Sequence, residues 1–283
     1  MKQLTPHTYV IPCNHATDRP AIGVVVGSHS VLVVDAGNSP AHAGEIQAAV
    51  RSVTHLPIRY LCITHWHWDH TFGMSAFPSA IKVAHPQTNR QLAHMKGYRW
   101  DDASLDARVK SGEEIPFCAD NIKKEYPDRS HIVITTADLT GKDIKFDLGG
   151  VHVRFFAVGG EHSVDSCCVY VDEDKVLFLG DSLCHNMFTG PWSYYLPEFE
   201  RRLSKISGID CNWYVNSHWD PQTAPEFASY CKQMRAVGSA MGDLTDEAAA
   251  GERFERVFGH VPDAEQLDLA LSYVRGNIKA LKR

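Results

Sequence analysis

The chain has 283 residues, of which 44% are hydrophobic and 22% are charged. This composition is that of a globular protein long enough for one large domain, and it excludes a disordered or fibrous chain. No apolar run approaches the roughly 20 residues of a membrane span. The net charge of −6 and the lack of long Lys or Arg runs argue against a polyanion binder, and the first residues show no secretory signal. We therefore expect a cytoplasmic protein that binds neither membranes nor nucleic acid.

Alternating strand and helix signals run along the chain. Strands are predicted, in chain order, at 21–27, 30–34, 58–63, 81–84, 132–135, 143–146, 151–158, 167–171, 176–179 and 213–215. Helices are predicted at 41–53, 87–95, 103–110, 197–206 and over most of 224–283. The charged segment 96–130 is interpreted as an insertion over one face. The order of strands, helix and strands occurs twice, which predicts an α/β fold in which two mixed sheets pack between helical layers as a single domain, 1–283.

Cysteine and histidine are the residue types that bear on chemistry. The eight cysteines form no CxxC pair, and in a chain without a visible signal we expect reduced thiols rather than a disulfide framework. The 16 histidines are an unusually high number for this length. Their positions along the chain, rather than their number, indicate what they do.

The segment 65–70 reads His-Trp-His-Trp-Asp-His and directly follows an apolar predicted strand. His65 and His67 occupy alternate positions and could converge on one ion, with Asp69 and His70 turned towards a second. Neutral imidazole and carboxylate suit Zn²⁺, and also Mn²⁺ or Fe²⁺. The alternative is a His-rich surface loop with its tryptophans packed beneath, and this motif by itself leaves both interpretations open.

Three further candidate ligands each follow a short apolar strand, and they are His162, Asp181 and His218. Loops at strand ends are where α/β folds place their functional residues. One aspartate after a strand is often only a helix cap. Together with the loop at 65–70, however, these positions supply seven ligands, which is enough for two cations.

This series of residues resembles the metallo-β-lactamase-fold hydrolases, whose signature is HxHxDH, a His in a G-H-S/T context, an Asp in L-x-G-D and a late His. The resemblance covers roughly residues 8–221 and implies a four-layer αββα sandwich with a dinuclear zinc site at one edge of the sheets. It further implies that the first metal is held by His65, His67 and His162. The second would be held by Asp69, His70 and His218, with Asp181 bridging both.

The differences between this motif and those of the individual branches of the family indicate which branch the chain resembles. True β-lactamases lack a bridging carboxylate at the position of Asp181, so we do not expect antibiotic hydrolysis. The ligand set is similar to that of glyoxalase II and lactonase-type members, but the basic C-terminal glutathione-binding pattern of glyoxalase II is not visible. The additional nucleic-acid-binding arms of the nuclease branches are not visible either.

The implied chemistry is hydrolysis. A hydroxide that bridges two divalent cations is a nucleophile at neutral pH, and Asp69 would orient it and shuttle a proton. We therefore predict a dinuclear zinc hydrolase that acts on a small ester, thioester or lactone. Because no GxSxG elbow or HExxH helix is present, no protein nucleophile is expected.

Aromatic residues supply the candidate substrate contacts. Trp192 and Trp68 are predicted to line an apolar pocket. Related lactonases use a tyrosine from this region, so Tyr194 or Tyr195 is a candidate donor to an oxyanion. For each of these residues the alternative is simple packing, and His185 is expected at the surface.

Three other functions remain open. One is a mononuclear iron enzyme resembling persulfide dioxygenases, in which His65, His162 and Asp181 hold iron. The second is a phosphodiesterase on the same scaffold, and the third is a noncatalytic protein whose metals only stabilise the fold. The helices after residue 224 would cap the sheet or form a homodimer contact.

Overall fold

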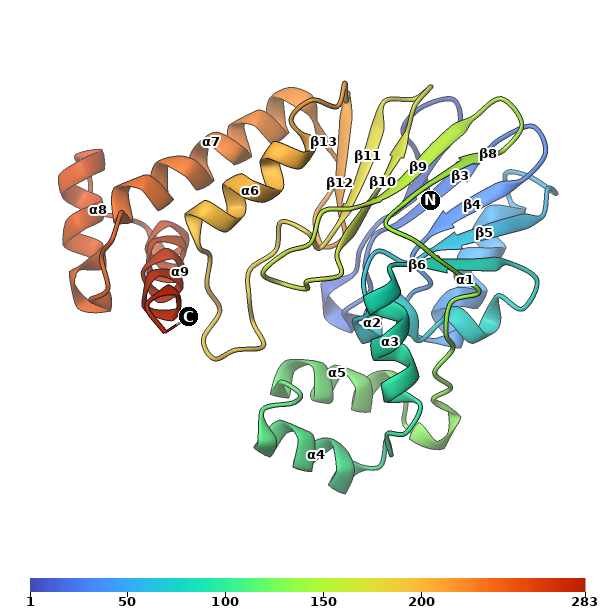
Figure 1. Ribbon diagram of the computed structural model, residues 1–283, viewed down its shortest axis with the longest axis horizontal. Coiled ribbons are helices and arrows are strands. Elements are labelled where there is room, and N and C mark those ends of the chain that lie inside the picture. Colours follow the sequence, from blue (N-terminus) through green and yellow to red (C-terminus); the bar gives the residue numbers. More distant parts are fainter. Residues whose placement is uncertain (283) are drawn as a thin grey trace.

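Two β-sheets pack face to face in the computed structural model, which describes residues 1–282 (Figure 1). The helices α1 (Pro40–Arg51) and α3 (Pro86–Met95) pack on the outer face of the first sheet. The helices α6 (Leu196–Ile206) and α7 (Ala224–Met241) pack on the outer face of the second. The predicted four-layer αββα sandwich is therefore confirmed.

The first sheet follows the chain order from β1 to β7. The predicted hairpin at 21–34 is present as the antiparallel pair β3 and β4. The strands β4 to β7 run parallel because crossover segments connect them, so their carboxyl ends lie at one edge. The strands are β1 (Lys2–Gln3), β2 (Thr8–Ile11), β3 (Ile22–Val26), β4 (Val31–Val34), β5 (Ile58–Cys62), β6 (Ile81–Ala84) and β7 (Leu139–Thr140).

The second sheet has the order β13-β12-β11-β10-β9-β8 and is mostly antiparallel. Only β11 and β12 run parallel, with α6 as their crossover. Their carboxyl ends therefore also meet at one edge. The strands are β8 (Asp143–Asp147), β9 (His152–Ala157), β10 (Cys167–Val171), β11 (Val176–Gly180), β12 (Trp213–Asn216) and β13 (Gln222–Thr223).

The remaining helices lie in loops and at the C-terminal end. They are α2 (Trp68–Thr71), α4 (Asp102–Ser111), α5 (Pro116–Glu125), α8 (Ala250–Phe258) and α9 (Ala264–Ala280), with 3₁₀ turns at His15–Thr17, Met74–Ala76, Arg129–His131 and Glu247–Ala249. The helical region predicted over most of 224–283 is broken at Gly242, which ends α7, and at Gly259, which ends α8. None of the helices in residues 1–282 has both the length and the apolar character needed to cross a membrane.

The predicted strand at 132–135 is wrong. This stretch is extended but unpaired, and the edge of the first sheet is completed by β7 instead. The backbone N–H groups just after this stretch do not pair with a strand of their own. Ala137 N donates to the side-chain Oδ1 of Asn89 at 2.7 Å, and Asp138 N donates to the carbonyl oxygen of Lys82 at 2.9 Å. The β-branched residues of the stretch therefore find no neighbouring strand to join.

The segment 96–130 contains two helices where one was predicted. Besides α4, the helix α5 begins with Pro116 in its first turn, a position at which proline favours helix initiation. Glu125 at its end accepts hydrogen bonds from Arg19 Nη2 at 3.3 Å and from Ser39 Oγ, which fastens α5 to the loop before β3 and to the start of α1. Figure 1 shows α4 and α5 at the same end of the molecule as the loop between β11 and α6. The description of the whole chain as one domain stays a prediction.

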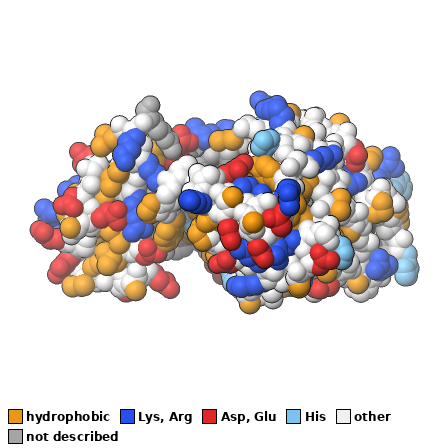
Figure 2. Space-filling view, turned by 90° about the horizontal axis from the view of Figure 1, so that it is seen from below, with side chains coloured by type: hydrophobic (Ala, Val, Ile, Leu, Met, Phe, Trp, Pro, Cys, Tyr) orange, Lys and Arg blue, Asp and Glu red, His pale blue; other side chains and the backbone are white. Residues whose placement is uncertain are grey.

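The face around α4 and α5 carries charges of both signs. Figure 2 looks at this end of the molecule and shows acidic and basic side chains interspersed, with hydrophobic side chains between them. Phe117 on α5 is half exposed, and Val133 just beyond the insertion is 56% exposed. No single sign of charge dominates this view.

One buried carboxylate joins the two halves of the sandwich. Asp174, in the turn between β10 and β11, accepts hydrogen bonds from His7 N at 3.0 Å, Thr8 Oγ1 at 2.6 Å and Thr5 Oγ1. Burial alone would raise the pKa of Asp174, but these hydrogen bonds hold it below its usual value. The ionised carboxylate therefore fixes the N-terminal strands against the second sheet.

We predict that Asp174→Ala lowers the free energy of unfolding by about 2 to 4 kcal/mol, because several charge-assisted hydrogen bonds are lost together. Denaturant unfolding followed by tryptophan fluorescence measures this. Because the pKa of Asp174 is lower in the folded than in the unfolded chain, its contribution is complete at neutral pH and disappears as the pH falls through the folded-state pKa. An equal loss of stability at pH 7 and at pH 2 would contradict this account.

Candidate metal centre

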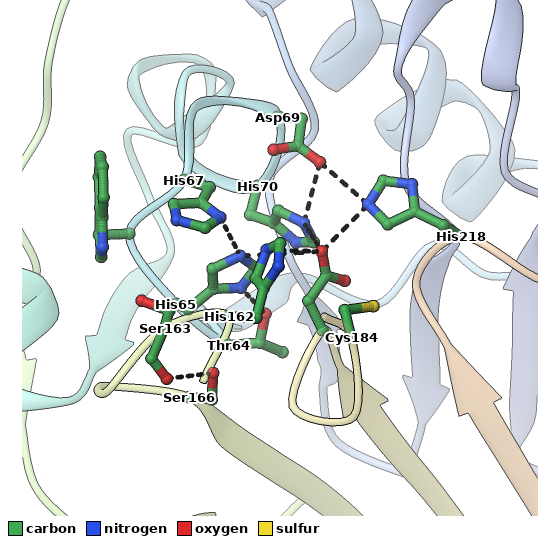
Figure 3. Close-up of polar contacts among 12 residues, drawn as sticks. Thr64, His65, His67, Asp69, His70, His162, Ser163, Ser166, Cys184 and His218 are labelled. Carbon is green, nitrogen blue, oxygen red and sulfur yellow. Dashed lines mark hydrogen bonds and ion pairs between the residues drawn. The ribbon is translucent and has the colours of Figure 1, made fainter. Parts of the chain in front are cut away.

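Separate segments of the chain meet at the edge where the strands of both sheets end (Figure 3). The loop after β5 and the helix α2 carry four of the predicted ligands. The loop between β9 and β10 and the ends of β11 and β12 carry the other three. The structure brings all seven together, and they are His65, His67, Asp69, His70, His162, Asp181 and His218.

Three imidazoles form the first group. Ligand atoms of His65, His67 and His162 all lie within 4.8 Å of one another. His65 Nε2 is 2.9 Å from Nδ1 of His67, so the two rings present nitrogen atoms to the same point. All three side chains are buried. This is the set that the resemblance assigns to the first metal.

Asp69, His70 and His218 form the second group, on the other side of the centre (Figure 3). Oδ2 of Asp69 is 2.9 Å from Nε2 of His70 and 3.4 Å from Nε2 of His218. The group therefore offers two nitrogen donors and one oxygen donor. This is the set that the resemblance assigns to the second metal.

Asp181 lies between the two groups. Its Oδ2 is 3.3 Å from Nε2 of His162 in the first group and 3.2 Å from Nε2 of His218 in the second. The same oxygen is 3.9 Å from His65 Nε2 and 3.7 Å from His70 Nε2. One carboxylate oxygen thus contacts both triads, the arrangement that a bridging ligand requires.

A glycine allows the two sheets to approach this closely. Gly180 precedes Asp181 and has a φ of +54°, and a Cβ at this position would lie 2.6 Å from Cβ of Thr64. Any larger residue would therefore push β11 away from the end of β5. The close approach places Asp181 beside His65.

Asp35 at the end of β4 orients His70. Its Oδ2 is 2.9 Å from His70 Nδ1, and its Oδ1 accepts a hydrogen bond from Thr64 N at 2.8 Å. Nδ1 of His162 is held in the same way, 3.0 Å from the carbonyl oxygen of His185. With Nδ1 engaged, each ring turns Nε2 towards the centre.

The protonation states suit cations. Burial lowers the pKa of His65 and of His67 well below the usual range, so both rings are neutral and keep a lone pair. Burial alone would raise the pKa of Asp181, but the imidazoles of His218 and His70 hold it well below its usual range. Burial alone would lower the pKa of His70 and of His218, but the carboxylates of Asp69 and Asp181 raise both well above the usual value. The centre therefore pairs two neutral imidazoles on the first side with two imidazoles on the other side whose charge is balanced by ionised carboxylates.

Several buried polar atoms of the centre have no hydrogen-bond partner in the described part of the chain. They are Nε2 of His67, of His70 and of His162, and Oδ1 of Asp181. Buried polar atoms without partners are costly, and they point here to a ligand that accepts lone pairs. Imidazole nitrogen and carboxylate oxygen are the donors that zinc and related divalent cations take. The residues therefore fit two such cations.

A cavity of about 590 Å³ opens onto the centre. Asp69, Asp181 and His218 form its floor, and apolar side chains form most of its walls. These come from α5, from the loop between β11 and α6, and from the residue after His218, and they are Ile115, Phe117, Cys118, Met187, Phe188, Trp192 and Trp219. The insertion and the loop together enclose the site.

The predicted substrate-contacting residues separate into two kinds. Trp192 lines the cavity, as expected, with its ring 4.5 Å from that of His185. Trp68 does not line it, because its indole is buried in the core and packs against Phe72. Trp66, from the same loop, borders a second groove, which shares His67 and His162 with the cavity.

Neither predicted tyrosine lines the cavity. Tyr194 is buried and packs against Phe199 and Tyr273 in the C-terminal core. Tyr195 donates its backbone N–H to Glu161 Oε2 at 2.9 Å and precedes the first turn of α6. Neither tyrosine is among the residues that line the cavity, and a catalytic role for Tyr194 or Tyr195 stays a prediction.

Sequence reasoning missed several residues of the site. His185 was expected at the surface but lines the cavity, and burial lowers its pKa to about 4, so the ring is neutral. Asp18 also lines the cavity, and burial together with the charge of Asp69 raises its pKa to about 7. Asp35 and Asp18 both have positive φ values, 68° and 49°. An aspartate followed by Ala-Gly after a strand was the available signal for Asp35.

Comparison with known proteins agrees with this geometry. A sequence profile described as the metallo-beta-lactamase superfamily matches residues 18–218. The chain belongs to this superfamily. The resemblance inferred from the ligand motifs is thereby confirmed.

Two curated relatives illustrate the range of this superfamily. The chain is 24% identical over 247 residues to the atrochrysone carboxyl ACP thioesterase of Aspergillus fumigatus, which covers 82% of this chain and 65% of that protein. It is 25% identical over 202 residues to the Lactamase-like protein nscB of Arthroderma otae, which covers 70% of this chain and 46% of that protein. The chain therefore spans less than two thirds of the length of either relative.

Solved structures show the same fold. The metallo-beta-lactamase from Pontibacter korlensis superimposes with a TM-score of 0.58 at 17% identity, over 82% of this chain and 96% of that one. A metallo-beta-lactamase family protein from Thermus thermophilus gives a TM-score of 0.58 at 18% identity, over 99% of this chain and 94% of that one. At such identities the similarity concerns the fold alone.

The contact between Asp35 and His70 yields a prediction. We expect Asp35→Asn to weaken the binding of added zinc about 10- to 100-fold, because His70 loses the carboxylate that orients its ring. Competition with a chromophoric chelator measures the affinity. The control is Asp174→Asn, which also neutralises a buried carboxylate but lies outside the centre. Equal zinc affinities in wild type and Asp35→Asn would contradict the assigned role.

Proposed function

We propose that the protein is a metal-dependent hydrolase, which holds two zinc ions and acts on a small ester, thioester or lactone. The observation that carries this proposal is the position of Asp181, whose Oδ2 lies within 3.3 Å of an imidazole nitrogen from each triad. A shared carboxylate between two ligand sets is suited to two adjacent cations. Mn²⁺ or Fe²⁺ would suit the same donors.

The chemistry divides between cations and side chains. Bound divalent cations supply acidified water and polarise a substrate carbonyl. Asp69 belongs to the second triad and lines the cavity without lying between the two triads as Asp181 does, so it orients the attacking group and takes up its proton. His70 and His162 are held in place by Asp35 and by the His185 carbonyl, which keeps the donors aligned.

The cavity supports a substrate with an apolar acyl part. Ile115 and Phe117 on one side and Met187 and Trp192 on the other present apolar surface next to the ligand carboxylates. An acyl group placed there would have its carbonyl beside Asp69 and Asp181. The similarity to a protein named as an ACP thioesterase favours a thioester among the three substrate classes.

Metal content is the first test. We expect about two zinc ions per chain by elemental analysis, and we expect activity to disappear on dialysis against a chelator while the far-UV circular dichroism is kept. One iron per chain together with oxygen uptake would instead indicate the dioxygenase-like alternative. Loss of the fold together with the metal, in a preparation that never hydrolyses any ester, would indicate a structural role for the metals.

The second test is a substrate panel. Purified, zinc-loaded protein is assayed with thioesters, lactones, phosphodiesters and β-lactams. We expect Asp181→Ala to lower kcat/KM for the best thioester or lactone at least about 10³-fold, because the shared ligand is lost. The matched control is Asp243→Ala, which removes an exposed aspartate after α7. Hydrolysis confined to phosphodiesters, or full activity in Asp181→Ala, would refute the proposal.

A further inference from the structure

A second, polar depression adjoins the metal centre. This groove of about 950 Å³ runs along the loop between β9 and β10 and the exposed side of α6. It shares His67, His162 and Phe188 with the apolar cavity, so the two spaces meet at the first ligand group. A substrate bound at the metals therefore has room on both sides of its reacting bond.

The groove is basic. Lys142, Arg201 and Lys205 line it. The one solvent-accessible carboxylate among its lining residues is that of Glu198, which pairs with Arg201 Nε at 2.7 Å. Glu161 also borders the groove, but its side chain is 4% exposed and lies 3.7 Å from the buried guanidinium of Arg202. The solvent-accessible part of the groove therefore has more basic than acidic side chains.

One backbone carbonyl positions two of these cations. Val158 O, at the end of β9, accepts hydrogen bonds from Lys205 Nζ at 2.7 Å and from Arg201 Nη1 at 3.4 Å. Both cations contact the same carbonyl oxygen, so their like charges repel, and burial together with the charge of Arg201 lowers the pKa of Lys205. Within residues 1–282, Lys142 on the adjoining wall forms no ion pair. An anion in the groove would relieve this repulsion.

We infer that this groove binds the leaving arm of the substrate, and that this arm carries a phosphate group. The inference rests on the proposed hydrolase function, since it places the acyl part in the apolar cavity and the thiol part in the groove. On hydrolysis, water adds to the thioester carbonyl, the carbon–sulfur bond breaks, and the sulfur leaves with a proton as the phosphate-bearing thiol. Phosphate suits the groove because lysine and arginine together present several donors to its oxygens.

The test compares octanoyl thioesters that differ only in the arm. Octanoyl-4′-phosphopantetheine carries the phosphate, octanoyl-N-acetylcysteamine is neutral, and octanoyl-glutathione carries carboxylates. We expect kcat/KM for the phosphopantetheine thioester to exceed that for the neutral one about tenfold or more. We expect this ratio to fall towards one in the double variant Lys142→Met/Lys205→Met, and to fall with rising salt concentration.

The control is Lys232→Met, which removes an exposed lysine on α7 outside the groove. The inference is wrong if the wild-type ratio is near one, if the double variant keeps the wild-type ratio, or if the lysines favour the glutathione thioester as strongly as the phosphopantetheine thioester. Coenzyme A and a carrier protein both present a phosphopantetheine arm. Octanoyl groups on each distinguish these two sources.

Calorimetry separates failure of this inference from failure of the proposed function. If none of the thioesters is hydrolysed, the proposed function fails, and titration with 4′-phosphopantetheine and with pantetheine still tests the groove. We expect the phosphate form to bind about tenfold more tightly to the wild type, and this preference to be lost in Lys142→Met/Lys205→Met. Equal binding of the two compounds would overturn the inference.

Discussion

Five imidazoles and two carboxylates are packed into one buried centre, and this crowding is the constraint on which the rest of the structure depends. Removing a carboxylate and several ring nitrogens from water is costly unless they gain partners. Within residues 1–282, Nε2 of His67 and Oδ1 of Asp181 have no hydrogen-bond partner. Divalent cations offset this cost because they take lone pairs from all the donors at once.

The scaffold accepts local backbone strain to hold this geometry. Asp35 has a φ of 68°, in a region that costs a non-glycine residue roughly 1 to 2 kcal/mol. Its carboxylate contacts Thr64 and His70, so the strained residue ties the end of β4 to the ligand loop after β5. On the second sheet, Gly180 allows the end of β11 to approach the same ligand loop, because a side chain at this position would collide with Thr64. Both ligand groups thus depend on one meeting point of the two sheets.

The surroundings of the centre are asymmetric. On one side, α5 and the loop after β11 contribute Phe117, Met187 and Trp192 to an apolar cavity. On the other side, α6 contributes Arg201 and Lys205 to a basic groove. Because His67 and His162 border both spaces, a single substrate can place chemically different ends on either side of the reacting bond. In the proposed function, the seven clustered side chains would supply the chemistry and the two walls would supply selectivity.

Most strand positions, and the clustering of seven histidine and aspartate side chains at the sheet edge, were predictable from the sequence, because both depend on short local patterns. Apolar runs such as 58–63 and 176–179 define strands, and a polar ligand directly after such a run must lie at the sheet edge. What surrounds the ligands was not predictable in the same way. The direction of Trp68, Tyr194 and His185 and the unpaired course of 132–135 depend on packing partners distant in sequence. In the last case, the edge of β6 is occupied by β7, and nothing in the local residues indicates this.

The sequence by itself therefore determined the fold class and which histidine and aspartate side chains meet at the sheet edge, since strand periodicity and the spacing of these residues are properties of neighbouring positions. The tertiary structure alone decided which aromatic side chains reach the cavity and which cations share the groove. A loop side chain points wherever the packing of remote elements leaves room, and it does so with little regard to its neighbours in the chain. Trp192 and Tyr194 are two positions apart, yet one lines the cavity and the other is buried against α9.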